Sequence, residues 1–273
     1  MSEKVYTLIP QGGLCNRMRM LDSGLALAAA TGRRLVVQWQ LDPGLNCHFE
    51  ELFEIPPGIA RIDTQDRMGR FAKLRKTIAK RLNRLRYDRC LYERDLADYM
   101  AMHGDLATLG QYRSVLIASC ERFYGQAPFF RDFVPTAANQ AEIDRLTARF
   151  APRMVGIHIR RTDHVHAITN SPTGLFITAM DKASPDTHFF VATDCPATEQ
   201  ELVERFPGRV ITHTKRSLDR GDASAIKDAL VDVYGLAACH SLLGSVRSSF
   251  SETAAQIGGI PLNLIDTRSS GTA

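Results

Sequence analysis

The sequence predicts an α/β protein made of two domains with mostly parallel sheets. Strand-like runs alternate with helical patterns almost throughout the 273 residues, which is the order of βαβ units. One such unit lies near the start, where an apolar run at 5–9, a glycine turn, a helical pattern at 16–32 and an apolar run at 33–39 follow each other. Between residues 153 and 266, five strand-like runs separated by helical patterns are enough for a doubly wound domain.

The two expected domains are residues 1–136 and residues 137–273, which meet at the start of a helical pattern. The expected strands are 5–9, 33–39, 114–120, 153–159, 188–193, 209–213, 241–246 and 260–266. The expected helices are 16–32, a basic helix within 67–89, 137–151, 172–183, 196–206, 222–239 and 249–259. Asn16 is expected to cap the first helix. Residues 40–66 carry several prolines and glycines and are expected to be loop with short pieces.

Composition and cysteine spacing exclude several classes of protein. A hydrophobic content of 44% and a charged content of 23% are typical of a soluble globular protein, and no apolar run reaches membrane-spanning length. The sequence MSEKVYTLIP enters a strand-like run directly, so we expect no secretory signal. The six cysteines are scattered without a C-x-x-C pair, which predicts neither a zinc site nor a disulfide framework. We expect reduced thiols in a cytoplasmic protein.

Residues 67–89 form a basic segment with ten Lys or Arg residues and one acid, a net charge of +9. Because the whole chain carries +4, the other 250 residues together carry −5. Apolar side chains recur in the segment at helical spacing, at Phe71, Leu74, Ile78, Leu82 and Leu85. We expect this helix to pack its apolar stripe against the protein and to leave its charges in water. Peripheral contact with an anionic membrane is the alternative, and nucleic acid is not expected as a partner.

Small or polar residues follow four of the expected strands, at the edge where open α/β sheets bind ligands. The sequence GGLCN follows the first strand. Its glycines, Gly12 and Gly13, allow a ligand to approach the backbone, and the next helix presents its N-terminal amides to anions. The same residues also fit an ordinary βα turn with Asn16 as the helix cap.

Two adjacent arginines, Arg160 and Arg161, follow the run VGIHI at the end of an expected buried strand. Burying two like charges is costly, so we expect an anionic group to neutralise them. The planar guanidinium group matches phosphate oxygens two at a time, which favours a phosphate ligand. The alternative is that one arginine pairs with Asp163 and the other points to solvent.

Three serines lead into the expected helix at 249–259. Ser248, Ser249 and Ser251 in the sequence RSSFSE place hydroxyl groups beside the first amides of that helix, which suits a phosphate. Ser249 and Glu252 also match the S-x-x-E capping box, so plain helix capping is an equal alternative.

Three stretches resemble the motifs of the α-1,6-fucosyltransferases and their bacterial nodulation relatives: HIRRTDH at 158–164, VATD at 191–194 and LLGSVRSSFSETAA at 242–255. GGLCNRM at 12–18 is similar to the start shared with the protein O-fucosyltransferases. The stretch 40–135 carries no such resemblance. The family implies a GT-B architecture, in which two Rossmann-like domains face each other across a cleft and the C-terminal one holds most of the sugar nucleotide.

The resemblance implies an inverting transferase that uses GDP-fucose and needs neither a metal ion nor another cofactor. The sequence agrees with this, because it contains no D-x-D motif that would hold a divalent ion on the diphosphate. The expected acceptor is a glycan or a lipid-linked glycan, bound on the side of the N-terminal domain, and a lipid-linked one would place the protein at the inner face of the membrane. The alternatives are a transferase that uses another GDP- or dTDP-sugar, and a non-catalytic protein that binds nucleotides or a membrane surface.

Matching positions carry the family's phosphate contacts onto the arginine and serine motifs. The resemblance implies that Arg160 holds the β-phosphate and that Arg161 supports the site. It also implies that Ser249 binds the diphosphate, with Ser248 and Ser251 beside it.

Other matching positions imply contacts to the rest of the donor. His158 and Asp232 would approach the guanine, and Asp194 would lie near the ribose. Asn16 would face the reacting centre from the other domain.

The sequence departs from the family at the general base. In the core-type enzymes a lysine follows R-R-T-D, and a glutamate comes five residues after its aspartate; His164 and Ile168 stand at these positions. His164, His166 or Glu121 would then take the proton from the hydroxyl group of the acceptor, and histidine is a suitable base near neutral pH.

Overall fold

The computed structural model describes residues 4–69, 72–162 and 165–268. The chain divides into two compact units. The first consists of Met1–Thr136 and Asp219–Ile226, and the second of Ala137–Leu218 and Lys227–Ala273. The late segment is attached to the first unit through Asn46, whose backbone N–H and side-chain amide donate to the carbonyls of Arg220 and Gly221 at 3.1 and 2.9 Å.

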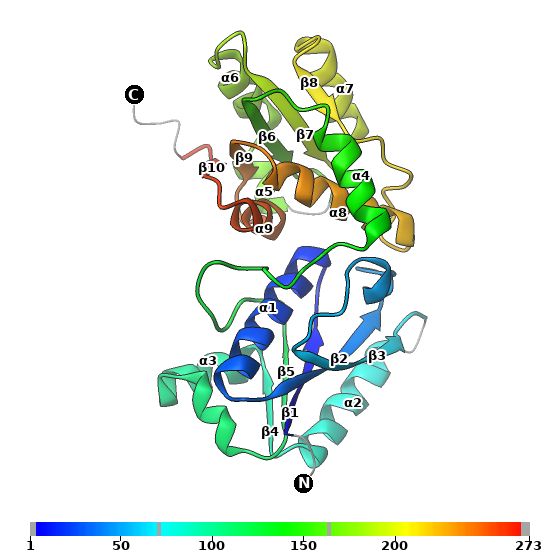
Figure 1. Ribbon diagram of the computed structural model, residues 1–273, viewed down its shortest axis with the longest axis vertical. Coiled ribbons are helices and arrows are strands. Elements are labelled where there is room, and N and C mark those ends of the chain that lie inside the picture. Colours follow the sequence, from blue (N-terminus) through cyan, green and yellow to red (C-terminus); the bar gives the residue numbers. More distant parts are fainter. Residues whose placement is uncertain (1–3, 70–71, 163–164, 269–273) are drawn as a thin grey trace. The chain divides into compact units, whose positions relative to one another are not determined.

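The first unit is a parallel sheet with helical connections (Figure 1). Its strands are β1 (Val5–Pro10), β2 (Arg34–Leu41), β3 (Ile59–Asp66), β4 (Arg89–Tyr92) and β5 (Val115–Ser119), in the spatial order β3-β2-β1-β5-β4. Its helices are α1 (Leu14–Ala30), α2 (Ala72–Arg86), α3 (Glu93–His103) and the 3₁₀ helices η1 (Phe49–Glu51) and η2 (Leu106–Gln111). The paired strands of this sheet run parallel, so each connection must cross over.

Burial explains which strands of the first unit the sequence predicts. The central strands β1 and β5 are buried along almost their whole length, which requires the continuous apolar runs VYTLIP and VLIAS. The expectation of loop at 40–66 is wrong for β3, an edge strand with an exposed face that contains charged side chains in the sequence IARIDTQD. The other edge strand, β4, is only four residues long, and neither it nor α3 was predicted.

The second unit repeats the same plan. Its strands are β6 (Met154–Ile159), β7 (His188–Thr193), β8 (Val210–Thr212), β9 (Ser241–Ser245) and β10 (Leu262–Ile265), in the parallel order β10-β9-β6-β7-β8. Its helices are α4 (Ala137–Thr147), α5 (Val165–Asn170), α6 (Thr173–Asp181), α7 (Pro196–Arg205), α8 (Ala223–Ala237), whose first turn belongs to the first unit, and α9 (Ser249–Gly258). The five strands expected after residue 153 are confirmed, and α5 was not predicted.

A core between this sheet and its helices fixes the strand ends. Its buried side chains come from β6, α6, β7, α7 and the residue after α7: Ile157, Ile159, Phe176, Met180, Phe189, Val191, Leu202 and Phe206. Because Ile159 is fully buried, the residue that follows it emerges from a fixed point of the sheet.

Each sheet has one place where the strand order reverses. In the first unit the order runs from β1 outward through β2 to β3, and β5 lies on the other side of β1. In the second unit the order runs from β6 through β7 to β8, and β9 lies on the other side of β6. Open α/β sheets bind ligands beyond the carboxyl ends of their strands at such reversals. The residues after β1 and β5, and those after β6 and β9, are therefore the positions to inspect for a site.

The basic helix α2 differs from the expectation. Four of its apolar side chains are exposed to solvent: Leu74 by 57%, Ile78 by 49%, Leu82 by 59% and Leu85 by 86%. The prediction that this stripe packs against the protein is therefore wrong; Phe71 lies outside the described residues. Over the described part of the chain, none of the helices has both the length and the apolar character needed to cross a membrane.

Candidate active site

Asp194 organises the turn that carries the two arginines. Ile159 and Thr193 are register partners at the ends of β6 and β7, so Arg160 and Asp194 leave the sheet side by side. One carboxylate oxygen of Asp194 accepts from the backbone N–H of Arg161 at 2.7 Å. The other accepts from the hydroxyl of Thr162 at 2.7 Å and lies 3.3 Å from Nε of Arg160. The carboxylate thus fixes the turn and orients the Arg160 guanidinium.

The two arginines have different environments. The Arg161 side chain donates to the Thr173 hydroxyl at 3.0 Å, to the Arg160 carbonyl at 3.1 Å and to the Ser171 carbonyl. Burial lowers the pKa of Arg161, against the opposing effect of Asp194. Arg161 therefore ties the end of β6 to the start of α6, whereas Arg160 is held at the edge by Asp194.

His158 connects β6 to the serine segment. Its ring is buried, its Nδ1 lies 2.7 Å from the Ser251 hydroxyl and 3.5 Å from that of Ser248, and it stacks on Phe250 with centroids 4.6 Å apart. Gly244, its register partner on β9, leaves the space for this contact, because a Cβ there would lie 2.6 Å from the Ser251 oxygen. Burial, reinforced by a nearby arginine, lowers the pKa of His158 to about 3. The ring is therefore neutral at neutral pH, where it is a poor proton carrier.

The start of α9 lacks the capping that the sequence suggested as an alternative. The capping residue is Ser248 rather than Ser249, and its side chain makes no cap hydrogen bond with any described residue. The prediction of a Ser249–Glu252 capping box is therefore wrong. The Ser248 and Ser251 hydroxyls turn to His158 instead, so the first amides of α9 have no side-chain cap within the described structure. Uncapped amides at a helix N-terminus attract anions.

Arg247 was missed by the sequence analysis. It is exposed, it directly precedes Ser248 in the turn between β9 and α9, and its φ of +55° lies in the left-handed region. Holding a side chain other than glycine in that region costs roughly 1–3 kcal/mol, and such strain concentrates at functional turns. Nothing in the sequence RSSFSE signals a positive φ, so this residue becomes a candidate only once the backbone is known.

Asp232 lies elsewhere on the same sheet edge. It is buried on α8, and its carboxylate lies 3.3 Å from Nδ1 of His213 and 3.5 Å from Nζ of Lys215, both of which follow β8. Burial opposes the charge on Lys215, but Asp232 and Glu199 outweigh it and raise the pKa of that amine. The structure thus groups Asp232 with the end of β8, apart from the arginine turn at the ends of β6 and β7.

In the first unit, Arg19 links the two expected residues. Its guanidinium donates to the side-chain oxygen of Asn16 at 2.8 Å and pairs with the Glu121 carboxylate at 3.0 Å. Asn16 follows β1 and Glu121 follows β5, so both lie where the order of this sheet reverses. Asn16 is not the helix cap, because α1 begins at Leu14 and Gly13 caps it.

Gly12 explains why the turn before α1 needs glycine. Its φ of +81° is left-handed, and a Cβ there would lie 2.7 Å from the Asn16 amide nitrogen. Arg17, which the sequence analysis missed, stabilises this turn through its side chain. Its buried guanidinium donates to the Gly12 carbonyl at 2.8 Å, pairs with Asp42 at 2.9 Å and lies over the Trp39 ring.

Solved structures of fucosyltransferases share this architecture over almost the whole chain. The NodZ alpha-1,6-fucosyltransferase soaked with GDP-fucose aligns with a TM-score of 0.67 and 18% identity, covering 99% of this chain and 97% of that one. The structure of NodZ from Bradyrhizobium gives a TM-score of 0.65 at 19% identity and covers 93% and 92%.

The chain has the fucosyltransferase fold. The structure of a mutant of Arabidopsis thaliana FUT1 in complex with GDP supports this at a TM-score of 0.65 and 16% identity, covering 96% of this chain and 70% of that one. POFUT1 in complex with GDP has a TM-score of 0.55 at 13% identity and covers 97% and 99%. No protein-family model matches the sequence, and no curated protein does either. The resemblance expected from the motifs is thereby confirmed at the level of the fold.

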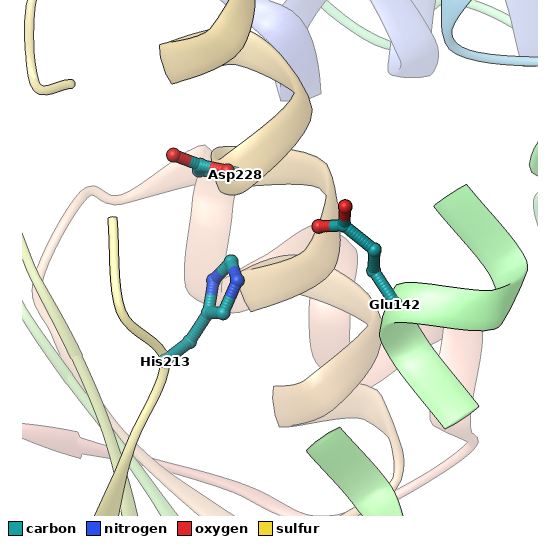
Figure 2. A group of neighbouring side chains, drawn as sticks. All are labelled: Glu142, His213 and Asp228. Atoms are coloured by element: carbon teal, nitrogen blue, oxygen red, sulfur yellow. The ribbon is translucent and has the colours of Figure 1, made fainter. Parts of the chain in front are cut away.

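Within this fucosyltransferase fold, one further group of side chains has the composition of a metal site. Glu142, His213 and Asp228 point toward one another from α4, the segment after β8 and α8, and their ligand atoms lie within 4.8 Å of each other (Figure 2). However, Nε of Arg216 donates to Asp228 at 2.8 Å, and its guanidinium lies 3.6 Å from Glu142. A guanidinium already supplies the positive charge, so the group is an ion-pair cluster that joins α4 to α8.

Two of the three expected general bases are described. Glu121 is exposed and paired with Arg19, and His166 is exposed on α5. His164 lies outside the described residues.

Proposed function

We propose that the protein is a glycosyltransferase that transfers fucose from GDP-fucose to a hydroxyl group of a glycan. The observation that carries the proposal is the position of Arg160, which Asp194 orients at the reversal of the second sheet, where α9 begins without a side-chain cap from the described residues. A positive group and free amides at this edge suit a diphosphate. The fold adds support, because NodZ, soaked with GDP-fucose, shares it.

The proposed reaction is an inverting displacement. The acceptor oxygen bonds to the anomeric carbon as the bond between that carbon and the β-phosphate oxygen breaks, and the electron pair leaves with GDP. The acceptor proton passes to a general base, for which we propose Glu121 or His164. Negative charge grows on the diphosphate, and Arg160, Ser249 and the α9 amides stabilise it. With no D-x-D motif in the sequence, we propose that arginine takes the place of a metal ion.

For the two units we propose a GT-B arrangement. The second unit would bind the donor, with His158 and Asp232 toward the guanine and Asp194 near the ribose, where it also positions Arg160. The first unit would bind the acceptor, with Asn16 facing the reacting centre.

The test measures release of GDP from GDP-fucose by the purified full chain, with Arg160→Ala as the variant and Arg153→Ala as the matched control. Arg153 is exposed and precedes the same strand. We expect Arg160→Ala to lower GDP release at least about 100-fold, the usual cost of losing one preorganised group that stabilises charge. Full activity in the folded Arg160→Ala variant would refute the assigned role.

Thermal protection by nucleotides separates the proposal from its alternatives. GDP should raise the melting temperature more than UDP or dTDP, because a ligand stabilises the state that binds it. A larger effect of dTDP would favour another donor, and protection by GDP without turnover of any donor would favour a binding protein.

A further inference from the structure

Helix α2 carries an apolar stripe on its outer face. Leu74, Ile78, Leu82 and Leu85 recur at steps of three and four, so they lie along one line of the helix, and all four are exposed. A surface helix normally turns such a stripe toward the core. Four large exposed apolar side chains in one line indicate a surface that another phase or molecule covers.

The inner face of α2 is polar and packs on the end of β4. Ala79 and Asn83 are half-buried residues of this face, the Lys80 ammonium lies 4.1 Å from the centroid of the Tyr92 ring, and Arg84 lies 3.8 Å from the Asp95 carboxylate. The helix is thus attached to the first unit through its polar side.

The sheet opposite explains this orientation. A cavity of about 580 Å³ lies between α2 and the sheet, and its lining includes Gln38 and Gln40 of β2, Gln65 of β3 and Arg67. Rotating α2 to bury its apolar stripe would place that stripe against these amide and guanidinium groups and leave the polar groups without water. The outward stripe is therefore a consequence of the side chains that β2 and β3 present.

Charges flank the stripe in the pattern of an interfacial helix. At about 100° per residue, Arg75 lies on one side of the stripe and Arg81 on the other. Both are exposed. The 15 residues of α2 contain seven Lys or Arg residues and no acid. Arginine at the edges of an apolar stripe matches the boundary between lipid phosphates and acyl chains.

We propose that α2 docks the protein onto the surface of an anionic lipid bilayer. The apolar side chains would enter the boundary between headgroups and acyl chains, and the flanking arginines would contact lipid phosphates. A second copy of the chain is a poorer partner, because a symmetric contact through this face would bring two sets of cations together. Nucleic acid would use the charges but leave the four apolar side chains exposed. The inference does not depend on the proposed transfer reaction.

The test is co-sedimentation of the full chain with phosphatidylcholine vesicles that contain or lack phosphatidylserine. One variant, Ile78→Gln with Leu82→Gln and Leu85→Gln, removes most of the stripe but keeps good helix formers. A second, Arg75→Gln with Arg81→Gln, removes the flanking charges. The matched controls are Met102→Gln with Val203→Gln, and Arg145→Gln with Arg153→Gln, which alter exposed residues of the same kinds on other elements.

We expect the wild type and both controls to bind the anionic vesicles. The arginine variant should bind roughly 25-fold more weakly, because each cation near the surface contributes about fivefold. The stripe variant should bind at least about tenfold more weakly. GDP release and protection by GDP should be unchanged in every variant, which keeps this test separate from that of the transferase.

Three outcomes would overturn the inference: no binding to anionic vesicles, equal binding by the α2 variants and the wild type, or a dimer in solution that the stripe variant abolishes while vesicles bind nothing. Circular dichroism of each variant checks that α2 still forms, so loss of binding is not mistaken for loss of the helix.

Discussion

Acidification should destabilise the second unit through one histidine. His158 is buried in β6, and its pKa falls from 6.5 to about 3 on folding. Below pH 6.5 the unfolded chain takes up a proton at this ring, while the folded chain does not until about pH 3. Because the unfolded state then binds more protons, stability falls as the pH falls from about 6.5 toward 3.

The size of this effect follows from the same shift. A pH of about 5 is about 1.5 units below the pKa of this ring in the unfolded chain, which corresponds to about 2 kcal/mol of lost stability. At about pH 7.5 the loss is close to zero. The variant His158→Gln keeps a hydrogen-bonding partner for Ser251 but does not titrate. We therefore expect the wild type to lose about 2 kcal/mol more than His158→Gln between about pH 7.5 and pH 5.

The assay is native-state hydrogen exchange of the β6 and β9 amides, corrected for the intrinsic exchange rate at each pH. The single tryptophan, Trp39, lies on β2 in the first unit, so its fluorescence does not follow the second. Equal pH dependence in the wild type and in His158→Gln would refute the reasoning, as would an NMR titration of His158 with an unshifted pKa.

Two further predictions concern the carboxylates of the second unit. Asp194→Asn should lower the stability of the second unit by about 2 kcal/mol, because the charge-assisted bonds to the arginine turn are lost. The same variant should lower GDP release at least about tenfold, because Arg160 is no longer held in place. Unchanged kinetics in the folded variant would contradict the positioning role of Asp194. Arg216→Met should cost about 3 kcal/mol because buried Asp228 keeps an uncompensated charge, measured by hydrogen exchange of the α8 amides. The metal-site interpretation would instead predict that zinc stabilises the wild type, so protection by zinc would contradict the ion-pair cluster.

The central strands explain why much of the second unit could be predicted. A parallel strand covered on both faces must be largely apolar, so β6 and β7 have the short, mostly apolar sequences MVGIHI and HFFVAT. Polar residues directly after such runs must lie at the carboxyl edge, which indicated that Arg160 and Asp194 lie at the same edge of the sheet. Which side chain fixes which required the register of Ile159 with Thr193, and sequence alone does not supply it.

Edge elements and caps escaped prediction for a different reason. β3 needs no apolar run because part of its surface faces water, and the prolines and glycine just before it resemble a loop. The serine segment fits a capping box in sequence, but α9 begins one residue earlier than that box requires, with Ser248 as its capping residue. The Ser248 hydroxyl lies 3.5 Å from Nδ1 of His158, and this contact competes with the cap.

Helix α2 shows that periodicity reveals an apolar stripe but not the direction in which it points. The spacing of its apolar residues is the same whether the stripe faces the core or the solvent. The direction is set by residues far away in the chain, because Gln38, Gln40 and Gln65 make the facing side of the sheet polar. A sequence argument would have to pair α2 with β2 and β3 before it could orient the helix. However, β3 was not predicted, because its exposed face carries polar and charged side chains. The wrong expectation for α2 therefore follows in part from the missed edge strand.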